Sequence, residues 1–247
     1  MVESARVLTG RVAIVTGGGS GIGRAVCLAF AAAGCRVHAL GRRVEPLEET
    51  ARLAPDGLVV PHRCDVTDRG QLRAVLDRVL EEHGWLDIVV NNAGLNVPNR
   101  RLSELTPEDW DRILAVNATG VFNMIHLCLP ILRRQGEGTV ITISSIAGLR
   151  PSTLAGAAYS AAKHAATALT RVLGIEEAKH GIRACVISPG EVDTPILSQR
   201  PEPVTEEHRA RILQPEDVAR AALFVASLPP RATVAELVIK PTTQAFA

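Results

Sequence analysis

Aromatic residues are scarce in this chain: they make up 3% of its 247 residues, and only one of them is a tyrosine. A core must therefore be built from Ala, Val, Leu and Ile, because few large rings are available to bury. The formal net charge is only +1, and the arginines are scattered without interleaved aromatics, which argues against nucleic-acid binding. The composition still predicts a folded protein, because 47% of the residues are hydrophobic and only 21% are charged.

Cysteine motifs and long apolar runs are missing as well. The five cysteines are odd in number and widely separated, with no C-x-x-C and no His pair at zinc spacing. We therefore predict buried thiols in a reducing compartment and no metal site. The first ten residues have neither the basic nor the apolar region of a signal peptide, and the longest apolar run, residues 25–35, is shorter than the ~18 residues of a membrane span. These absences predict a cytoplasmic protein without a membrane segment.

Seven short, nearly continuous apolar segments recur along the chain, with helical patterns between them. Strands that are apolar throughout are typical of a parallel sheet covered on both faces. One predicted helix ends near Gly34, and another begins at Thr67 and ends at Gly84. The alternation predicts one α/β domain over residues 1–247, with a doubly wound parallel sheet and helices on both faces. The predicted strands are residues 12–16, 36–40, 58–64, 86–94, 138–145, 182–190 and 235–241.

One segment near the C-terminus is rich in proline. Pro195, Pro201, Pro203 and Pro215 flank the charged stretch TEEHRAR. Long irregular loops in compact domains are usually functional, so we predict a mobile lid over residues 191–214 near a ligand. The alternative is a solvated surface loop.

A glycine cluster lies where the first predicted strand turns into the first predicted helix. The stretch TGGGSGIG, residues 16–23, has the spacing G-x-x-x-G-x-G. Such a turn lets the backbone approach a pyrophosphate, and the N–H groups at the following helix N-terminus favour an anion. A purely structural turn is the alternative. We predict that a dinucleotide pyrophosphate binds Gly17, Ser20, Gly21, Ile22 and Gly23.

The end of the second predicted strand indicates the type of nicotinamide cofactor. An acidic residue there would accept hydrogen bonds from the ribose of NAD, whereas an arginine would bind the 2′-phosphate of NADP. Gly41 occupies the expected acidic position and is followed by Arg42 and Arg43. Because a guanidinium can clamp a phosphate, we predict a preference for NADP(H), with NAD(H) also possible. Two arginines that merely decorate an exposed turn are the alternative.

Four motifs, TGGGSGIG, NNAG, YSAAK and SPG, follow one another along the chain. Their order and spacing resemble the short-chain dehydrogenase/reductase (SDR) family, and the resemblance covers residues 12 to about 241. It implies a Rossmann-type, NAD(P)-binding fold and an oxidoreductase acting on CH–OH groups. The substrate would be a small-molecule alcohol, such as a secondary alcohol or hydroxy acid, or the corresponding carbonyl.

The lone tyrosine, Tyr159, lies four residues before Lys163, so the two side chains share a face if this stretch is helical. The resemblance implies that Tyr159 is the general acid or base and that Lys163 holds the nicotinamide ribose. Because positive charge favours a phenolate, we predict that Lys163 and an oxidised nicotinamide lower the pKa of Tyr159 from about 10. The alternative is a core tyrosine beside a lysine that reaches solvent.

Two further residues complete the implied catalytic set. Ser145 matches the family serine that hydrogen-bonds the substrate oxygen, with the adjacent Ser144 as the alternative. Asn117 matches an asparagine that bends a helix and holds a water in a proton relay. A helical asparagine with a local backbone bond is the alternative.

The resemblance also implies further cofactor contacts at three strand ends. Asp65 and Val66 match residues that contact the adenine. An asparagine and a glycine at a strand end can also be explained by turn chemistry alone. The residues expected to line the dinucleotide are Asn92, Ala93 and Gly94, and those expected around the nicotinamide are Pro189, Gly190, Val192 and Thr194.

The substrate pocket is expected to be mostly apolar, with one cation. Arg150 could bind a substrate carboxylate, or it could simply face solvent. The chain ends in ATVAELVIKPTTQAFA rather than a glycine-rich strand, which resembles members acting on hydroxy acids or small aldehydes more than 3-ketoacyl carrier-protein reductases. The candidate lining residues are Leu95, Asn96, Pro98, Leu149, Arg150, Leu154, Ile196 and Leu197.

Two questions of assembly and activity stay open at this point. The resemblance implies a homodimer or homotetramer built through long helices, but the small residues around Tyr159 could equally pack within one subunit. The chain could also be a nucleotide-binding regulator without turnover. Such a regulator would be expected to have a damaged catalytic set, whereas here the set is complete.

Overall fold

The strands form one parallel sheet, as the sequence predicts. The structure is a computed structural model, and it describes residues 6–245. The strand order is β3-β2-β1-β4-β5-β6-β7, and every neighbouring pair is parallel. The predicted doubly wound α/β fold is therefore confirmed. The strands are β1 (Val12–Thr16), β2 (Arg36–Gly41), β3 (Val59–Arg63), β4 (Ile88–Asn91), β5 (Gly138–Ile143), β6 (Ile182–Pro189) and β7 (Glu236–Ile239).

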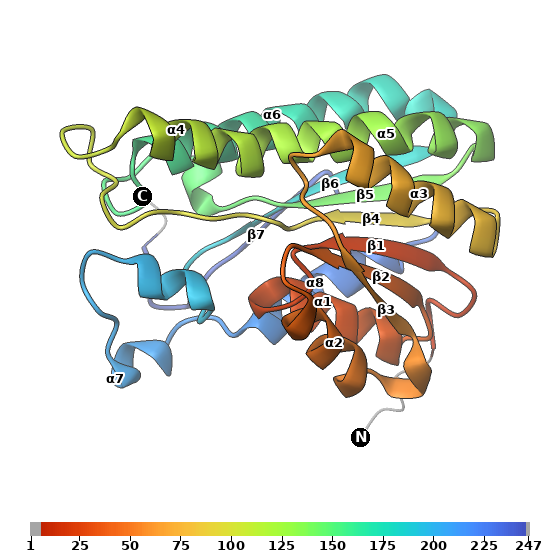
Figure 1. Cartoon of the computed structure of the whole chain (residues 1–247), viewed down its shortest axis with the longest axis horizontal. Helices are drawn as coiled ribbons and strands as arrows, with labels where there is room; N and C mark the ends of the chain where they lie inside the picture. Colours follow the sequence, from red (N-terminus) through yellow and green to blue (C-terminus); the bar gives the residue numbers. More distant parts are fainter. Residues whose placement is uncertain (1–5, 246–247) are drawn as a thin grey trace.

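Helices cover both faces of the sheet. Figure 1 shows α3, α4, α5 and α6 along one face and α1, α2 and α8 along the other. Short helical segments lie between the longer elements. They are the 3-10 turns η1 (Pro55–Gly57), η3 (Ile146–Gly148), η4 (Ala178–His180) and η5 (Pro195–Gln199) and the π-helical segment η2 (Ala115–Thr119). The α-helices are α1 (Gly21–Ala32), α2 (Val44–Leu53), α3 (Arg69–His83), α4 (Pro107–Leu114), α5 (Gly120–Gln135), α6 (Ala157–Glu177), α7 (Glu206–Arg209) and α8 (Pro215–Ala226).

The sheet separates two apolar cores, and alternate side chains of β1 pack into one core and the other. All five residues of β1 are buried. Ala13 and Val15 pack in the core beneath α1 and α8, whereas Val12 and Ile14 pack in the core beneath α3 and α5. Side chains alternate across a strand, so a strand covered on both faces must be apolar at every position. This requirement explains the continuous apolar runs in the sequence.

The predicted helix ends are partly right. Gly34, just after α1, has a φ of +89°, and Gly84, just after α3, has a φ of +82°, a backbone conformation that favours glycine. The predicted start of α3 at Thr67 is wrong. Asp68 caps this helix instead, because its carboxylate accepts hydrogen bonds from the backbone N–H groups of Gly70 and Gln71.

The fourth strand is shorter than predicted. The predicted segment covers residues 86–94, but β4 ends at Asn91. The next residue leaves the sheet because the side-chain amide of Asn92 donates to the backbone oxygen of Thr16, 2.9 Å away. This contact turns the chain toward the glycine-rich segment, so the residues after β4 belong to a site at the strand ends.

One long helical stretch passes a length and composition test for a membrane span. It runs from Pro107 to Gln135 through α4, η2 and α5. Half of its most apolar window is buried inside the structure, with Met124 and Leu132 in the core beneath α3 and α5. A buried core helix satisfies the same test, so this stretch carries no independent argument for a membrane.

The five cysteines are all buried and none forms a disulfide. Burial raises the pKa of each of these thiols; that of Cys64 rises to about 11. A thiol with a raised pKa is a poor nucleophile and metal ligand, so we assign the cysteines a packing role in the apolar cores. The prediction of buried thiols is confirmed.

Candidate active site

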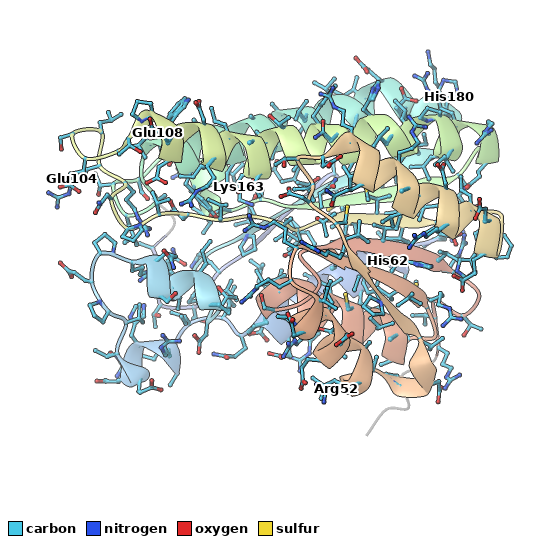
Figure 2. All side chains as sticks on the ribbon, viewed as in Figure 1. Arg52, His62, Glu104, Glu108, Lys163 and His180 are labelled. Atoms are coloured by element: carbon cyan, nitrogen blue, oxygen red, sulfur yellow. The ribbon has the colours of Figure 1, made fainter. Side chains whose placement is uncertain are left out.

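A cleft of about 750 Å³ opens at the carboxyl ends of the central strands. Loops after β1, β4, β5 and β6 form it, and α6 contributes Tyr159 and Lys163, the latter labelled in Figure 2. In open parallel sheets, ligands bind at this end of the strands. The structure brings most of the predicted site residues to this cleft. They are Gly17, Ser20, Gly21, Ile22, Arg42, Asn92, Ala93, Gly94, Ser145, Tyr159, Lys163, Pro189, Gly190, Val192 and Thr194.

The glycine-rich turn fits a pyrophosphate. Gly17 and Gly21 have φ angles of +69° and +51°, so the backbone there adopts a conformation that side chains rarely allow. Helix α1 begins at Gly21, and the hydroxyl of Ser20 at its N-terminus makes no capping hydrogen bond. The first turn of α1 also carries no acidic residue. Uncapped N–H groups and the helix dipole at this end favour an anion.

Gly23 serves packing and does not line the cleft. A Cβ atom at this position would lie 2.1 Å from the backbone oxygen of Gly17 and 2.5 Å from Nδ2 of Asn92. Helix α1 can therefore approach the end of β1 only because residue 23 has no side chain. The sequence-based prediction assigned this glycine to the pyrophosphate, whereas the structure shows that it allows close packing of the helix on the strand end.

Replacing Gly23 with alanine should destabilise the protein. The added methyl group would overlap backbone atoms that cannot rotate away, which typically costs about 1–3 kcal/mol or more. We expect Tm to fall by roughly 3–10 °C in a thermal melt. Gly174→Ala in α6 is the matched control, because its Cβ atom would lie 3.4 Å from that of Ala184, an ordinary contact. Equal Tm values for Gly23→Ala and the wild type would contradict the packing role.

The two arginines after β2 differ in position. Arg42 lines the cleft and is exposed, whereas Arg43 lies just before α2 and does not line it. A Cβ atom at Gly41 would meet Leu47 at 3.4 Å, so a side chain can fit there. Space therefore does not explain the missing acidic residue.

Two predicted adenine contacts also lie outside the cleft lining. The carboxylate of Asp65 accepts hydrogen bonds from the backbone N–H and the hydroxyl of Thr67, at 2.9 and 2.8 Å. The side chain of Val66 is buried and packs close to Gly120. Both residues hold the turn after β3, and neither is shown to face the cleft.

Tyr159 and Lys163 share one face of α6, as their spacing predicts. The ammonium nitrogen of Lys163 lies 5.6 Å from the centre of the Tyr159 ring and donates a hydrogen bond to the backbone oxygen of Ile143 at 2.8 Å. Lys163 is 5% exposed, and burial lowers its pKa to about 8. Tyr159 is half-buried and lines the cleft.

The predicted direction of the tyrosine pKa is wrong for the protein without a nucleotide. Burial of the phenol raises the pKa of Tyr159 to about 12, because a phenolate is poorly solvated there. A hydrogen bond with Ser145 and the positive charge of Arg100 oppose this rise. The sequence-based argument counted the charge of Lys163 but not the desolvation, which the sequence does not reveal.

The structure separates the two neighbouring serines. Ser144 is buried, and its hydroxyl lies 2.8 Å from that of Thr167 and donates to the backbone oxygen of Lys163. Both serines line the cleft, but it is Ser145 that hydrogen-bonds to Tyr159, and it accepts a bond from the backbone N–H of Ala147 at 3.1 Å. Only Ser145 combines a place beside the phenol with partial exposure.

Asn117 lies in the π-helical segment η2 and is fully buried. Its amide group accepts from the N–H of Leu95 and donates to the oxygen of the same residue, both at 2.9 Å. Its hydrogen bonds therefore reach the loop after β4 rather than its own helix, unlike the local bond considered as an alternative. A Cβ atom at Gly94 would lie 3.5 Å from the Asn117 oxygen and 3.6 Å from the Lys163 nitrogen. This glycine leaves space between the two groups.

The substrate half of the cleft is partly as predicted. Leu95, Asn96, Arg150, Leu154, Ile196 and Leu197 line it, whereas Pro98 and Leu149 do not. Sequence reasoning missed Arg100, which is 6% exposed and donates to the backbone oxygens of Val97, Leu154 and Gln199. It also missed Gln244, and it did not single out Glu191 or Arg200, which lie in the predicted lid over residues 191–214. No motif marks these residues, because they meet only when distant loops fold together.

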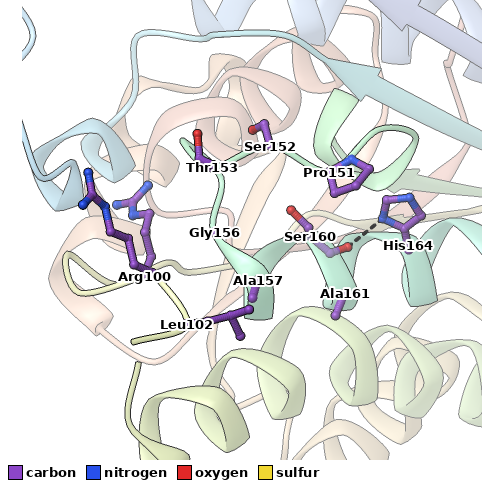
Figure 3. Close-up of a pocket in the computed structure, with 11 residues that line it drawn as sticks. Arg100, Leu102, Pro151, Ser152, Thr153, Gly156, Ala157, Ser160, Ala161 and His164 are labelled. Carbon is purple, nitrogen blue, oxygen red and sulfur yellow. Dashed lines mark hydrogen bonds between the residues drawn. The ribbon is translucent and has the colours of Figure 1, made fainter. Parts of the chain in front are cut away.

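A second cavity of about 730 Å³ adjoins the cleft (Figure 3). It is lined mainly by small or apolar groups of the loop before α6 and the first turns of that helix, and by Arg100 and Leu102. Arg100, Pro151 and Ser152 line both cavities. The cleft carries the polar groups and the residues predicted to be catalytic, so we assign the candidate site to it.

The strand order and the cleft at the carboxyl ends of the strands define a Rossmann-type dinucleotide-binding protein. Residues 11–204 match the profile of the family described as short chain dehydrogenase. This chain therefore belongs to the short-chain dehydrogenase/reductase family.

Similar proteins agree with this assignment. A 3-oxoacyl-[acyl-carrier-protein] reductase of Thermotoga maritima is 34% identical over 227 residues, which cover 89% of this chain and 92% of that protein. The structure of a Brucella melitensis 3-ketoacyl-(acyl-carrier-protein) reductase complexed with NADH has a TM-score of 0.85 and 29% identity, covering 94% of this chain and 98% of that one. An alcohol dehydrogenase of Thermococcus sibiricus complexed with 5-hydroxy-NADP has a TM-score of 0.84 and 31% identity, covering 95% and 98%.

Proposed function

We propose that this protein interconverts an alcohol and its carbonyl by NADP(H)-dependent hydride transfer, with Tyr159 as the general acid or base. The observation that carries the proposal is the joint placement of Ser145, Tyr159 and Lys163 in the cleft next to the glycine-rich turn. When bound, the nicotinamide cofactor supplies or accepts the hydride. The residues of this chain must then bind the cofactor, orient the substrate and move one proton.

Proton transfer falls to the phenol of Tyr159. During reduction its hydroxyl would donate a proton to the carbonyl oxygen, while the hydroxyl of Ser145 donates a hydrogen bond to the same oxygen. In the oxidative direction the phenolate would take the proton from the alcohol. With a pKa of about 12 the phenol stays protonated at neutral pH, so oxidation needs a nearby positive charge that lowers the pKa and favours the phenolate.

Lys163 is placed to position groups rather than to exchange the proton itself. A Cβ atom at Gly94 would lie 3.6 Å from its ammonium nitrogen and 3.5 Å from the Asn117 oxygen, so both groups border the space at this glycine. There it would hold the nicotinamide ribose hydroxyls and favour the phenolate of Tyr159. Asn117 would hold a water between this lysine and the loop after β4, as in the proton relay that the family resemblance implies.

Cofactor preference can be tested at the end of β2. We expect the wild type to have a higher kcat/KM with NADPH than with NADH, because Arg42 lies on the cleft where a 2′-phosphate would bind. The double variant Gly41→Asp/Arg42→Ile should reverse this preference, with a change in the ratio of about 10²-fold or more. Arg43→Ile is the matched control and should change the ratio much less. A wild type that prefers NADH would contradict the NADP(H) assignment.

The substrate half favours a small alcohol or carbonyl, and a hydroxy acid in particular. Glu191 is the one carboxylate of the cleft lining and lies 3.3 Å from Arg200, so an anionic group would still meet net positive charge there. The arginines of the lining in this half are Arg100, Arg112, Arg150 and Arg200. A panel should pair NADP⁺ with 3-hydroxy acids, serine and secondary alcohols, and NADPH with aldehydes, ketones and an acetoacetyl thioester. The thioester is included because the Thermotoga maritima relative is named as a 3-oxoacyl-carrier-protein reductase.

The same panel separates an enzyme from a regulator. An enzyme oxidises or reduces at least one compound, whereas a regulator of the same fold binds NADPH and turns over none. The presence of Ser145, Tyr159 and Lys163 in one cleft favours the enzyme.

We propose that residues 191–214 form the substrate lid of a single domain. Ile196, Leu197 and Arg200 of this segment line the cleft. Arg200 lies 3.3 Å from the carboxylate of Glu191, and Arg209 lies 2.5 Å from that of Asp193. These ion pairs link the later part of the segment to its first residues. We further propose that the protein assembles as a homodimer or homotetramer and that it is cytoplasmic.

A further inference from the structure

Three histidines from separate elements converge near one edge of the sheet. His38 of β2 is 1% exposed. Its Nδ1 lies 2.8 Å from Nε2 of His62 on β3, and its Nε2 lies 3.0 Å from Nε2 of His83, the last residue of α3. Figure 2 labels His62 at this edge. Three of the chain's seven histidines thus meet outside the cleft, and none of them lines it.

A carboxylate adjoins two of these rings. Oε1 of Glu82 lies 3.4 Å from Nε2 of His83. One ligand atom each from His38, Glu82 and His83 lies within 4.8 Å of the other two. Ligand atoms ~2.0–2.1 Å from a tetrahedral zinc ion lie about 3.3 Å from one another. The separations of 3.0 and 3.4 Å are therefore close to those of a metal-ligand set.

We propose that Nε2 of His38, Nε2 of His83 and a carboxylate oxygen of Glu82 bind one zinc ion. Two imidazoles and one carboxylate are ligands that zinc takes, and a water molecule would fill the fourth position. Glu82 is exposed, so an ion can enter from solvent. The ion would join β2 to the end of α3, which identifies the site as structural.

His62 fits the role of an outer partner. A metal-bound histidine usually donates its second ring N–H to an acceptor, and Nδ1 of His38 faces Nε2 of His62 at 2.8 Å. This contact fixes the orientation of the His38 ring, with Nε2 directed toward His83.

One cation competes for the carboxylate. Nη2 of Arg36 lies 3.6 Å from Oε1 of Glu82, and Nη1 of Arg36 donates to the backbone oxygen of Gly57 at 2.8 Å. The same oxygen, Oε1, faces both Arg36 and His83, so zinc would replace the 3.6 Å contact with Arg36 unless the carboxylate turns to present its second oxygen to Arg36. Without a metal, hydrogen bonds between ring nitrogens join His38 to both other rings.

Direct metal measurement tests the proposal. Tag-free protein is treated with EDTA, desalted, incubated with ZnCl₂ and analysed for bound zinc by mass spectrometry. We expect about one zinc ion per chain and a Tm higher by roughly 5 °C when zinc is in large excess over its Kd. Co²⁺ in place of Zn²⁺ should give the strong visible absorption of a tetrahedral site.

Variants distinguish this site from adventitious binding. His83→Gln and Glu82→Gln should each weaken zinc binding by about 100-fold or more, and His62→Gln by about 10-fold. His126→Gln is the matched control, because His126 is exposed and stacks only on Phe122. Circular dichroism of each variant in EDTA reports whether it folds.

Two results would overturn the zinc site. One is a wild type that retains no zinc, and the other is equal zinc binding by the wild type and a folded His83→Gln variant. The measurement reads metal rather than turnover, so it is independent of the proposed activity. A positive result would revise the sequence-based prediction of no metal site, which relied on spacing along the chain.

Discussion

Tyr159→Phe should lower kcat by at least ~10³-fold, because it removes the proton donor and keeps the ring. The dissociation constant for NADPH should change little, since the glycine-rich turn and Lys163 remain. Steady-state kinetics on the best substrate of the panel and nucleotide binding by fluorescence measure the two quantities. Turnover near that of the wild type would refute the role of Tyr159 as general acid or base.

The lone tyrosine also allows its titration to be followed directly. The ultraviolet absorbance of the phenolate, at longer wavelength than that of the neutral phenol, measures the ionisation of Tyr159, and the Tyr159→Phe variant provides the blank. Without nucleotide the signal should appear only as pH approaches 12, above the ordinary value of 10. A phenol whose pKa is raised by folding stabilises the native state below pH 10, and this contribution is lost between pH 10 and 12. Circular dichroism over the same range therefore has to accompany the titration.

Adding NADP⁺ should move this titration to lower pH, because an oxidised nicotinamide brings positive charge next to the phenol. NADPH, whose nicotinamide ring is neutral, is the control and should move it less. Equal titration curves with both nucleotides would contradict a charge effect on Tyr159.

Lys163→Met should lower kcat/KM by about 10²-fold or more and raise the KM for NADPH. The ammonium is the buried cation that faces both the Tyr159 ring and the space near Gly94. Methionine has a similar length but cannot hold a ribose hydroxyl or favour a phenolate. Lys179→Met, at an exposed position, is the matched control and should leave both values unchanged.

The same variant should be more stable than the wild type without nucleotide. Burial lowers the pKa of Lys163 from 10.5 to about 8, so below pH 8 the charged lysine costs the folded state about 3 kcal/mol. Methionine removes this cost but leaves the oxygen of Ile143 without its donor, a loss of about 1 kcal/mol. We expect Tm at pH 7 to rise by roughly 5 °C. A lower Tm would show that Lys163 stabilises the fold.

The pH dependence gives an independent check on this argument. Between pH 8 and 10.5 the unfolded state binds a proton that the folded state has released, so stability contributed by Lys163 rises with pH in this window. The wild type should therefore gain stability relative to Lys163→Met as pH increases from 8 to 10.5. Urea denaturation at several pH values measures the difference. A constant difference would contradict the lowered lysine pKa.

Predictions about the fold succeeded where the information is local. The apolar runs fix the strands, because each strand is covered on both faces, and the glycines at 34 and 84 mark helix ends by their backbone conformation. Predictions failed at boundaries that depend on specific contacts. Thr67 resembles a helix cap, but Asp68 accepts the hydrogen bonds, and β4 stops early because Asn92 binds Thr16.

The sequence by itself determined the order of strands and helices, the glycine-rich turn and the shared face of Tyr159 and Lys163. Each follows from neighbours along the chain, whose spacing is fixed by the geometry of a strand or helix. The tertiary structure alone decided the raised pKa of Tyr159, the bonds of Asn117 to Leu95 and the meeting of His38 with His83. These properties depend on burial and on contacts between residues far apart in the chain, and no local pattern records either.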